Sequence, residues 1–521
     1  MCLCTFCGEK SQITCSRCEQ AFCGTEHQRL HEFQDGSACY PFRIKESAEV
    51  GRFIVASKDI LPGEVIFEEE VVVAGPNQET IPICLFCHEE VDCEFLCSSC
   101  GYPFCNDHCL TNCDHELECQ ILSVAHNKEK KNVFRPSVIN RESYHVILPL
   151  RLLLSQQKKP YGYNMVNRLM DHNQERQKFP YWEESQVKVV DLIRNAHDQG
   201  NEIPEEKLHR IVGILEVNAY ELYASATGAG FRGIFCVGSL LSHSCIANTT
   251  HMWSKSPPFV NKCIASVSIK QGTEICSKYV HPATGTWNRR QELKSGWFFE
   301  CRCDRCADPT ESGSSLSTIV CKTCQMEEND SQMSWALPKD PLSWFTNWIC
   351  HTCGCEQNGL TVQEKMQSFL DSLKYIIYHH RNDENKYLDL IKEAKSFFHP
   401  HHQVFCQISK WFLPVFCRKS GMSTKDFPTQ KLIIKLELCR NQLDVFDIVC
   451  PGLTKYRAKV MFEYVDVALA LREKGETGLK LPDPFTLQSM AEESYHILSL
   501  ENHLTPFEEC IFYSLCMILK N

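Results

Sequence analysis

Hydrophobic and polar positions follow two patterns along this chain: short β-type runs in some regions and helical spacing in others. Short runs rich in β-branched residues occur at 51–75 and again over 231–280, as in CIASVSI and TEICSKYV. Within the first run, Leu61-Pro62-Gly63 separates two such stretches. A Pro-Gly pair between two β-type runs predicts a β-hairpin over 51–75.

Helical spacing dominates the other regions. We predict helices over 141–156 and 181–226. Pro204-Glu205-Glu206 is a typical helix start, and apolar residues follow it at helical spacing, namely Leu208, Ile211, Val212 and Leu215. From about residue 362 onward the pattern predicts a succession of helices without metal-ligand motifs, which is typical of an α-helical packing domain.

Composition sets the class of protein. A chain of 521 residues predicts two to four domains, and 43% apolar with 23% charged residues is typical of a soluble globular protein. No stretch is apolar enough to span a bilayer, so we expect no membrane association. MCLCTFCGEK does not look like a signal peptide. A net charge of −11 argues against a general nucleic-acid coat.

The 34 cysteines change this picture most. Many form C-x-x-C pairs with interleaved histidines, a pattern that favours zinc over disulfides in a reducing compartment. We therefore expect zinc as a structural cofactor and a cytoplasmic or nuclear location, with no strong basic localisation run to decide between them.

Two cysteine-dense modules, residues 4–39 and 84–119, resemble each other. Each has two C-x-x-C pairs, a further Cys, then Cys or His, and a closing His and Cys. Interleaved pairing of the second module predicts two zinc sites, one of Cys84, Cys87, Cys105 and Cys109 and the other of Cys97, Cys100, His115 and Cys119. Cys93 and Cys113 are left over as plain buried thiols.

The first module is less regular. Cys4, Cys7, Cys23 and His27 form one predicted site. Cys15, Cys18 and Cys39 need a fourth ligand, for which His31 is preferred over Asp35. The alternative is a single zinc with spare thiols.

Two further cysteine groups lie after residue 300. Cys321, Cys324, Cys350 and Cys353 predict another structural zinc, for which Cys355 is a substitute ligand. Cys301, Cys303 and Cys306 supply only three ligands, so the fourth must come from elsewhere in the chain.

The order of several motifs is similar to one known family. GRFIVASKDILPGEVI resembles the start of a SET domain, LLSHSCIANTT (240–250) the signature NHSCxPN, GTEICSKY the motif GEEITISY, and WFFECRCDRC the post-SET tail. The two cysteine modules resemble MYND zinc fingers. This layout resembles the SET-and-MYND (SMYD) protein-lysine methyltransferases, and the extra N-terminal finger is similar to an arthropod-type branch.

The resemblance implies an α+β multidomain fold in which a MYND finger interrupts the SET β-fold, with a TPR-like helical C-terminal domain. The expected domains are an N-terminal finger (1–40), a SET N-terminal part (43–80), a MYND finger (84–119), a helical insert (120–230), a SET C-terminal part (231–290), a post-SET zinc (291–310), a Cys4 site (320–356) and a helical domain (360–521).

The resemblance also implies site residues. Cys245 completes a zinc site with Cys301, Cys303 and Cys306. The implied reaction is methyl transfer from S-adenosylmethionine to a lysine amine, with Tyr279 as the catalytic tyrosine. The implied cofactor contacts are Gly51, Arg52, Phe53, Asn218, Ser242, His243, Tyr279 and Phe299. Asn248 is expected to support the local strand arrangement.

Three positions depart from the family pattern. Phe53 stands in place of a glycine that lets the backbone approach the cofactor, Ser242 replaces an asparagine, and Trp297 replaces a second tyrosine. Two hypotheses follow: a protein-lysine methyltransferase acting on histone or non-histone protein, or a scaffold and transcriptional repressor with little catalysis.

The expected partners are a substrate protein carrying the lysine and proteins that bind the MYND fingers. Direct DNA binding is the least favoured reading, because the first finger carries few Lys and Arg and no recognition helix. We expect a monomer.

Overall fold

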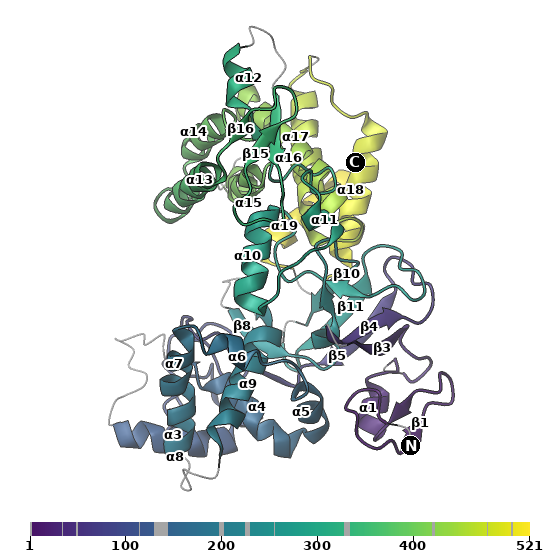
Figure 1. Cartoon of the computed structure of the whole chain (residues 1–521), viewed down its shortest axis with the longest axis vertical. Coiled ribbons are helices and arrows are strands. Elements are labelled where there is room, and N and C mark those ends of the chain that lie inside the picture. Colours follow the sequence, from purple (N-terminus) through teal and green to yellow (C-terminus); the bar gives the residue numbers. More distant parts are fainter. Residues whose placement is uncertain are drawn as a thin grey trace. The chain divides into compact units, whose positions relative to one another are not determined.

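The computed structural model describes residues 3–520 except 34, 48–49, 114, 130–143, 197–202, 224–229, 255, 328–333, 419–422, 477 and 502–503. The chain forms two compact units, whose elements are labelled in Figure 1. The first comprises Met1–Ser242, Thr249–Ile275 and Glu501–Thr505. The second comprises His243–Asn248, Cys276–Leu500 and Pro506–Asn521. The boundary therefore falls inside the stretch 240–250.

Small antiparallel sheets form the β part of the first unit. One pairs β3 with β4, another has the order β10-β11-β5, and a third has the order β6-β8-β7. Their strands are β3 (Phe42–Ser47), β4 (Gly51–Ala56), β5 (Val65–Glu70), β6 (Val73–Pro76), β7 (Tyr220–Tyr223), β8 (Gly230–Ile234), β10 (Thr249–Trp253) and β11 (Val260–Ala265), and the N-terminal finger adds the pair β1 (Ile13–Thr14) and β2 (Ala21–Phe22).

The hairpin predicted over 51–75 is wrong in its pairing, although both strands are present. β4 pairs with β3, and β5 pairs with β11. The intervening loop runs beside the segment after β11, where the Ile60 N–H donates to the Ile269 carbonyl at 2.8 Å and the Gly63 N–H to the Ala265 carbonyl at 2.9 Å. The Pro-Gly turn thus connects two sheets, because β4 pairs with the strand just before it in the chain, whereas β5 pairs with the distant strand β11.

Helices make up the rest of the first unit. They are α1 (Thr25–Arg29), α2 (Asp107–Asn112), α3 (Glu116–Glu129), α4 (Ile147–Lys158), α5 (Pro160–Val166), α6 (Asn173–Arg176), α7 (Tyr181–Ser185), the π-helix η2 (Gln186–Asp191), α8 (Leu192–Ala196), α9 (Glu205–Asn218) and the short 3-10 turn η3 (Gly238–Leu240).

The helix predictions for this unit are largely confirmed. α9 begins directly after Pro204, and its predicted apolar positions are buried. The helix predicted to reach residue 226 ends at Asn218, because 220–223 is the strand β7. Residues 141–143, 197–202 and 224–226 of the predicted helices lie outside the described residues.

One hydrophobic core runs through the first unit. It joins the N-terminal finger (Phe6, Phe22), the strands β3 and β5 (Phe42, Phe67) and the second finger (Phe104). Each of these rings is at most 1% exposed. Both fingers are therefore packed parts of this unit.

The second unit begins with α10 (Thr286–Trp297) and α11 (Asp304–Ala307). A four-stranded sheet follows with the order β13-β14-β15-β16. The strands of this sheet are β13 (Ile319–Val320), β14 (Trp335–Pro338), β15 (Trp348–Cys350) and β16 (Glu356–Gln357), and α12 (Lys322–Glu327) lies between the first two in the chain. The unit also contains the strand β12 (Cys276–Ser277), and the boundary between the units falls within β9 (Ser242–His243).

The helical C-terminal region predicted from about residue 362 is confirmed. Consecutive helices from α16 to α19 pack on one another, as in stacked helical pairs. The helices are α13 (Gly359–His379), α14 (Glu384–Ala394), α15 (Gln403–Arg418), η4 (Thr424–Asp426), α16 (Thr429–Val449), α17 (Lys455–Glu473), α18 (Pro484–Ser499) and α19 (Pro506–Lys520).

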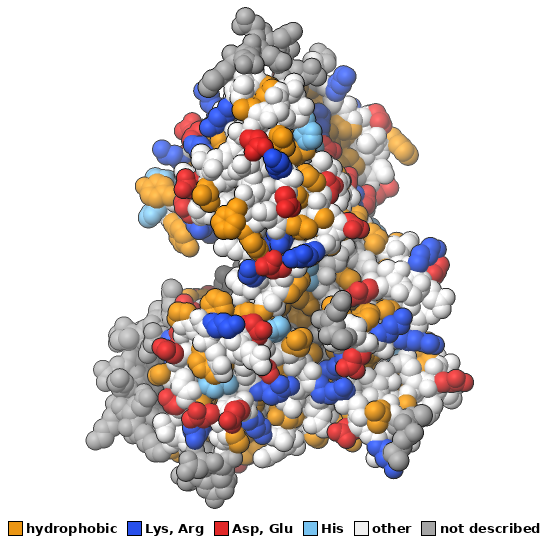
Figure 2. All heavy atoms as spheres, viewed as in Figure 1, with side chains coloured by type: hydrophobic (Ala, Val, Ile, Leu, Met, Phe, Trp, Pro, Cys, Tyr) orange, Lys and Arg blue, Asp and Glu red, His pale blue; other side chains and the backbone are white. Residues whose placement is uncertain are grey.

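Two surface properties follow from the described residues. None of their helices has the length and apolarity to cross a bilayer. On the face in Figure 2, basic and acidic side chains are interspersed rather than gathered into one basic field.

Candidate metal centres and active site

The structure brings the predicted zinc ligands together as clusters. In five of them every candidate ligand atom lies within 4.8 Å of the others, and they are Cys4/Cys7/Cys23/His27, Cys15/Cys18/His31/Cys39, Cys84/Cys87/Cys105/Cys109, Cys97/Cys100/His115/Cys119 and Cys245/Cys301/Cys303/Cys306. In the sixth group, the Sγ atoms of Cys321 and Cys353 are 3.6 Å apart and those of Cys324 and Cys350 are 3.8 Å apart.

These spacings fit zinc. Four thiolate or imidazole ligands at Zn–S distances of about 2.3 Å form a tetrahedron with edges of about 3.8 Å. The sulfur–sulfur distances agree, for example 3.4 Å between the Sγ atoms of Cys7 and Cys23 and 3.5 Å between those of Cys87 and Cys105. The donor sets are saturated with four protein ligands, so these centres are structural.

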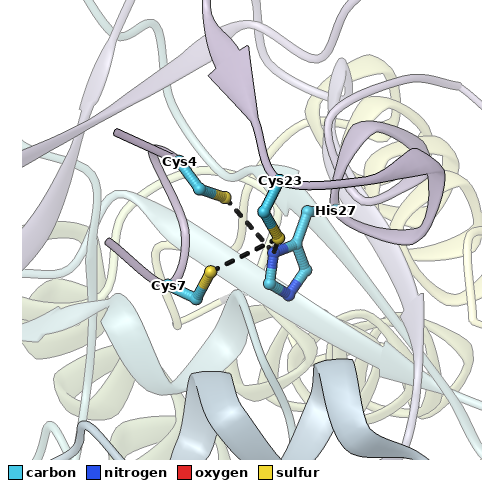
Figure 3. A group of neighbouring side chains, drawn as sticks. All are labelled: Cys4, Cys7, Cys23 and His27. Carbon is cyan, nitrogen blue, oxygen red and sulfur yellow. Dashed lines mark hydrogen bonds between the residues drawn. The ribbon is translucent and has the colours of Figure 1, made fainter. Parts of the chain in front are cut away.

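The first cluster of the N-terminal finger is shown in Figure 3. The Nδ1 atom of His27 lies 3.3 Å from the Cys4 Sγ and 3.2 Å from the Cys23 Sγ. Its other ring nitrogen, Nε2, lies 3.2 Å from the Tyr161 carbonyl oxygen. His27 is thus oriented as a metal ligand whose second nitrogen donates to the backbone.

The second cluster of this finger contains His31, and the alternative ligand Asp35 lies elsewhere. The His31 Nε2 is 2.9 Å from the Cys18 Sγ. The Asp35 carboxylate instead accepts from the Ser37 N–H at 2.9 Å. The Nδ1 atom of His31 is buried and has no hydrogen-bond partner among the residues that the structure describes.

His115 of the second finger has a different environment. Its Nε2 lies 3.2 Å from the Cys100 Sγ, and its Nδ1 lies 2.7 Å from the Glu118 carboxylate. Arg151 of α4 donates to both oxygens of Glu118, at 2.7 and 2.8 Å. Burial raises the pKa of Glu118, but Arg151 and His115 outweigh it and lower that pKa to about 2.

The stretch 240–250 supplies Cys245 to the post-SET cluster. Its Sγ lies 3.8 Å from that of Cys301 and 3.5 Å from that of Cys306. Nearby, the Asn248 side-chain oxygen accepts from the Cys276 N–H at 2.8 Å, which supports its expected structural role.

His243 connects this cluster to Tyr279. The Tyr279 backbone N–H donates to the Nδ1 of His243 at 3.1 Å. The Nδ1 therefore carries no proton, so the neutral ring holds its proton on Nε2, 3.3 Å from the Cys245 Sγ. Burial, together with Arg289, lowers the pKa of His243 to about 4. Because both ring nitrogens are engaged, the ring face and backbone remain for a cofactor.

Aromatic rings surround Tyr279 in the second unit. The ring centroid of Tyr279 lies 5.3 Å from that of His243 and 5.2 Å from that of Trp297. Phe299 lies 6.0 Å from His243. The tail residue Trp297 thus packs directly on the candidate catalytic tyrosine.

The other predicted cofactor residues belong to the first unit. Gly51 has a φ of +70°, which suits glycine, and Phe53 is half-buried in β4. The Arg52 guanidinium donates to the Phe6 carbonyl at 2.6 Å and to the Met165 carbonyl at 3.3 Å. Its side chain is therefore committed to the finger and α5, so only its backbone is left for a cofactor.

Asn218 is the last residue of α9, and Ser242 is the first residue of β9, shortly after η3. The Asn218 amide donates to the carbonyls of Ile214 and Met170, at 2.9 and 3.0 Å. β4 lies against η3, which leads directly into the half-buried Ser242.

Sequence reasoning missed one positioning residue here, Glu69. This fully buried carboxylate accepts from the backbone N–H groups of Gly238 at 2.6 Å and Val237 at 2.9 Å. Burial raises its pKa to about 7, against the lowering effect of these N–H groups. Its only sequence signal is an inward-facing acid in the Glu68-Glu69-Glu70 run.

Comparison with known proteins adds family information. No family model matches the chain. The SET domain-containing protein SmydA-8 of Drosophila melanogaster, isoform A, is 28% identical over 317 residues, covering 60% of this chain and 64% of that protein. Isoform B is 25% identical, covering 66% of its length. The chain therefore spans slightly less than two thirds of these relatives.

Two further similarities are more distant. The Arabidopsis thaliana histone-lysine N-methyltransferase ASHR1 is 24% identical over 279 residues, covering 51% of this chain and 55% of that protein. The solved SET domain of LSMT bound to lysine and AdoHcy aligns over 93% of this chain and 89% of its own, at 12% identity and a TM-score of 0.26, from which nothing is concluded.

The ordered motifs, the cysteine clusters and the SmydA-8 similarity make this chain similar to the SMYD-type SET-domain proteins, with several Cys/His clusters that could hold zinc.

Proposed function

We propose that this protein transfers a methyl group from S-adenosylmethionine to a lysine side chain of a histone or non-histone protein. The observation that carries the proposal is the linkage of Tyr279, through His243, to Cys245 of the post-SET cluster. A zinc-tied loop thereby fixes the position of the candidate catalytic tyrosine.

The residues of the second unit suit this chemistry. When bound, S-adenosylmethionine supplies the methyl group from its sulfonium. The rings of Trp297, Tyr279 and Phe299 exclude water, which lowers the pKa of a lysine amine and favours its neutral, nucleophilic form. Aromatic faces also attract a sulfonium cation. Rigid placement of Tyr279 aligns the reacting groups, a large part of the rate enhancement in a two-substrate transfer.

The test is binding followed by transfer. Calorimetry with S-adenosylmethionine should show binding, and a labelled methyl group should appear on lysine of a protein library. Tyr279→Phe should abolish transfer. Tyr387→Phe is the matched control, because its hydroxyl donates to the Arg381 carbonyl at 3.2 Å in the helical region. Absence of cofactor binding would sink the proposal.

The second candidate function is a scaffold or transcriptional repressor adaptor that binds proteins through its two MYND fingers. Phe53 in place of glycine and the commitment of the Arg52 side chain to the N-terminal finger favour it. In this case the stacked C-terminal helices, TPR-like in arrangement, are a second protein-binding surface. Methyl transfer that is lost in Tyr279→Phe would count against this function. Cytoplasmic or nuclear residence is proposed for either.

A further inference from the structure

A fully buried arginine lies against the sulfur atoms of the post-SET cluster. Arg289 is 0% exposed, and an arginine is almost never fully buried unless its charge is paired. Its Nε donates to the Cys245 Sγ at 3.1 Å, and its Nη2 to the Cys306 Sγ at 3.3 Å. Two of its five donors therefore point at predicted zinc ligands.

The three remaining donors are also satisfied. Nη1 donates to the Thr284 carbonyl at 2.6 Å and to the Glu311 carboxylate at 2.8 Å, and Nη2 donates to the Thr286 hydroxyl at 3.0 Å. Arginine has five N–H donors in a fixed planar fork, so this complete pairing fixes the guanidinium in one orientation.

Glu311 completes the arrangement. It is 1% exposed and accepts from Arg289, Arg305 and the Thr286 N–H. Arg305 also donates to the Cys245 carbonyl at 2.8 Å. One carboxylate thus orients two arginines around Cys245.

The charges explain why the site needs such a cation. Zinc with four thiolates carries a net charge of about −2, which is costly to bury without compensation. A guanidinium that donates N–H bonds to the sulfur atoms offsets this charge and withdraws electron density from the thiolates.

We propose that Arg289 is a positioning residue that stabilises the tetrathiolate zinc centre through paired N–H···S bonds, lowers the reactivity of its thiolates and fixes Cys245. The consequence for Tyr279 passes through His243 and rests on the proposed function. The zinc part stands independently of it.

The test compares two neighbouring arginines by site-resolved alkylation. Purified, zinc-loaded full-length protein is treated with iodoacetamide, and labelling of each cysteine is followed by mass spectrometry, together with zinc release to a chelator. Arg289→Met should raise the labelling rate of Cys245, Cys301, Cys303 and Cys306 about tenfold and release one zinc equivalent faster. Labelling of the finger cysteines should stay unchanged.

Arg290→Met is the matched control. Arg290 is also buried in α10, but it donates to the carbonyls of Cys301 and Leu342 rather than to sulfur. It should leave the four labelling rates close to wild type. Equal rates in Arg289→Met and Arg290→Met would overturn the proposal.

Arg289→Lys keeps the charge but not the planar fork. It should restore part of the protection, which loosening of α10 alone would not explain. If Arg289→Met fails to fold, Arg289→Lys becomes the test variant. Labelling and zinc-release rates equal to wild type in Arg289→Lys would overturn the paired N–H···S assignment. Neither readout requires S-adenosylmethionine, so a protein without methyl transfer would leave the result interpretable.

Discussion

The two zinc fingers have similar ligand spacing but different surroundings. In the second finger, His115 donates to a buried carboxylate that Arg151 holds from α4. In the N-terminal finger, His27 donates to the Tyr161 carbonyl, and no described residue pairs with the Nδ1 of His31. The histidine ligands are alike, but the group that pairs with the second ring nitrogen is a carboxylate in the second finger and a backbone carbonyl, or no described group, in the N-terminal finger.

This difference indicates which groups make each finger rigid. Groups that hold a metal-bound histidine typically contribute 10- to 100-fold in metal affinity. Arg151 also donates to the Ala74 and Leu85 carbonyls, at 2.7 and 2.9 Å, which ties the second finger to β6. We therefore expect the second finger to be a rigid part of its unit, and the N-terminal finger to lose zinc and unfold before it.

The largest expected effect comes from Arg151→Met. The change leaves the Glu118 carboxylate, 2% exposed, without its cation, at a cost of about 3–5 kcal/mol. Urea unfolding followed by fluorescence should show a lower midpoint, and Cys97, Cys100 and Cys119 should become the most readily alkylated cysteines. If the cysteines of the N-terminal finger were alkylated before Cys97, Cys100 and Cys119 in this variant, the assigned role of Arg151 would be contradicted.

The next effect is the order of zinc release in the wild-type protein. The cluster of Cys15, Cys18, His31 and Cys39 should lose zinc to a chelator about 10- to 100-fold faster than the cluster of His115, because His31 lacks an orienting partner. Alkylation of the released cysteines identifies the site. Earlier zinc release from the His115 cluster would contradict the difference inferred between the two fingers. Total zinc should be on the order of six per chain.

Arg52→Met tests the anchor of the N-terminal finger with a smaller expected effect. Its bond to the Phe6 carbonyl is lost, but Arg168 still reaches that oxygen at 3.5 Å. We expect a loss of about 1 kcal/mol, seen as faster proteolysis of residues 3–40 with the second finger intact. Equal cleavage of both fingers would show that Arg52 supports the whole unit.

The smallest effect is expected for Arg29→Met, which also serves as the Arg→Met control for the two variants above. Arg29 and Glu26 form an exposed i,i+3 pair with N–O distance 3.5 Å. Such pairs contribute about 0–0.5 kcal/mol, so the unfolding midpoint should not change measurably. A large shift would mean that the finger depends on surface charge.

The sequence predicts most of the metal ligands because C-x-x-C spacing is local and the chemistry of zinc is strict. It also predicts α9, from Pro204 and the buried positions after it, and the C-terminal helices. The pairing of β4 and β5 was predicted wrongly, because β4 pairs with the preceding strand β3, and only tertiary packing brings β5 to the distant strand β11.

The sequence by itself determined the order of the motifs, the resemblance that they carry and the ligand sets of the second finger, since each depends on residue types at fixed separations. The sequence already preferred His31 over Asp35, and the structure places His31 in that cluster. Tertiary structure alone decided the bond from the Tyr279 N–H to His243 and the buried cations Arg151 and Arg289. The physical reason is that a charge is buried only where a distant segment supplies its partner, and no local spacing encodes which segment that is.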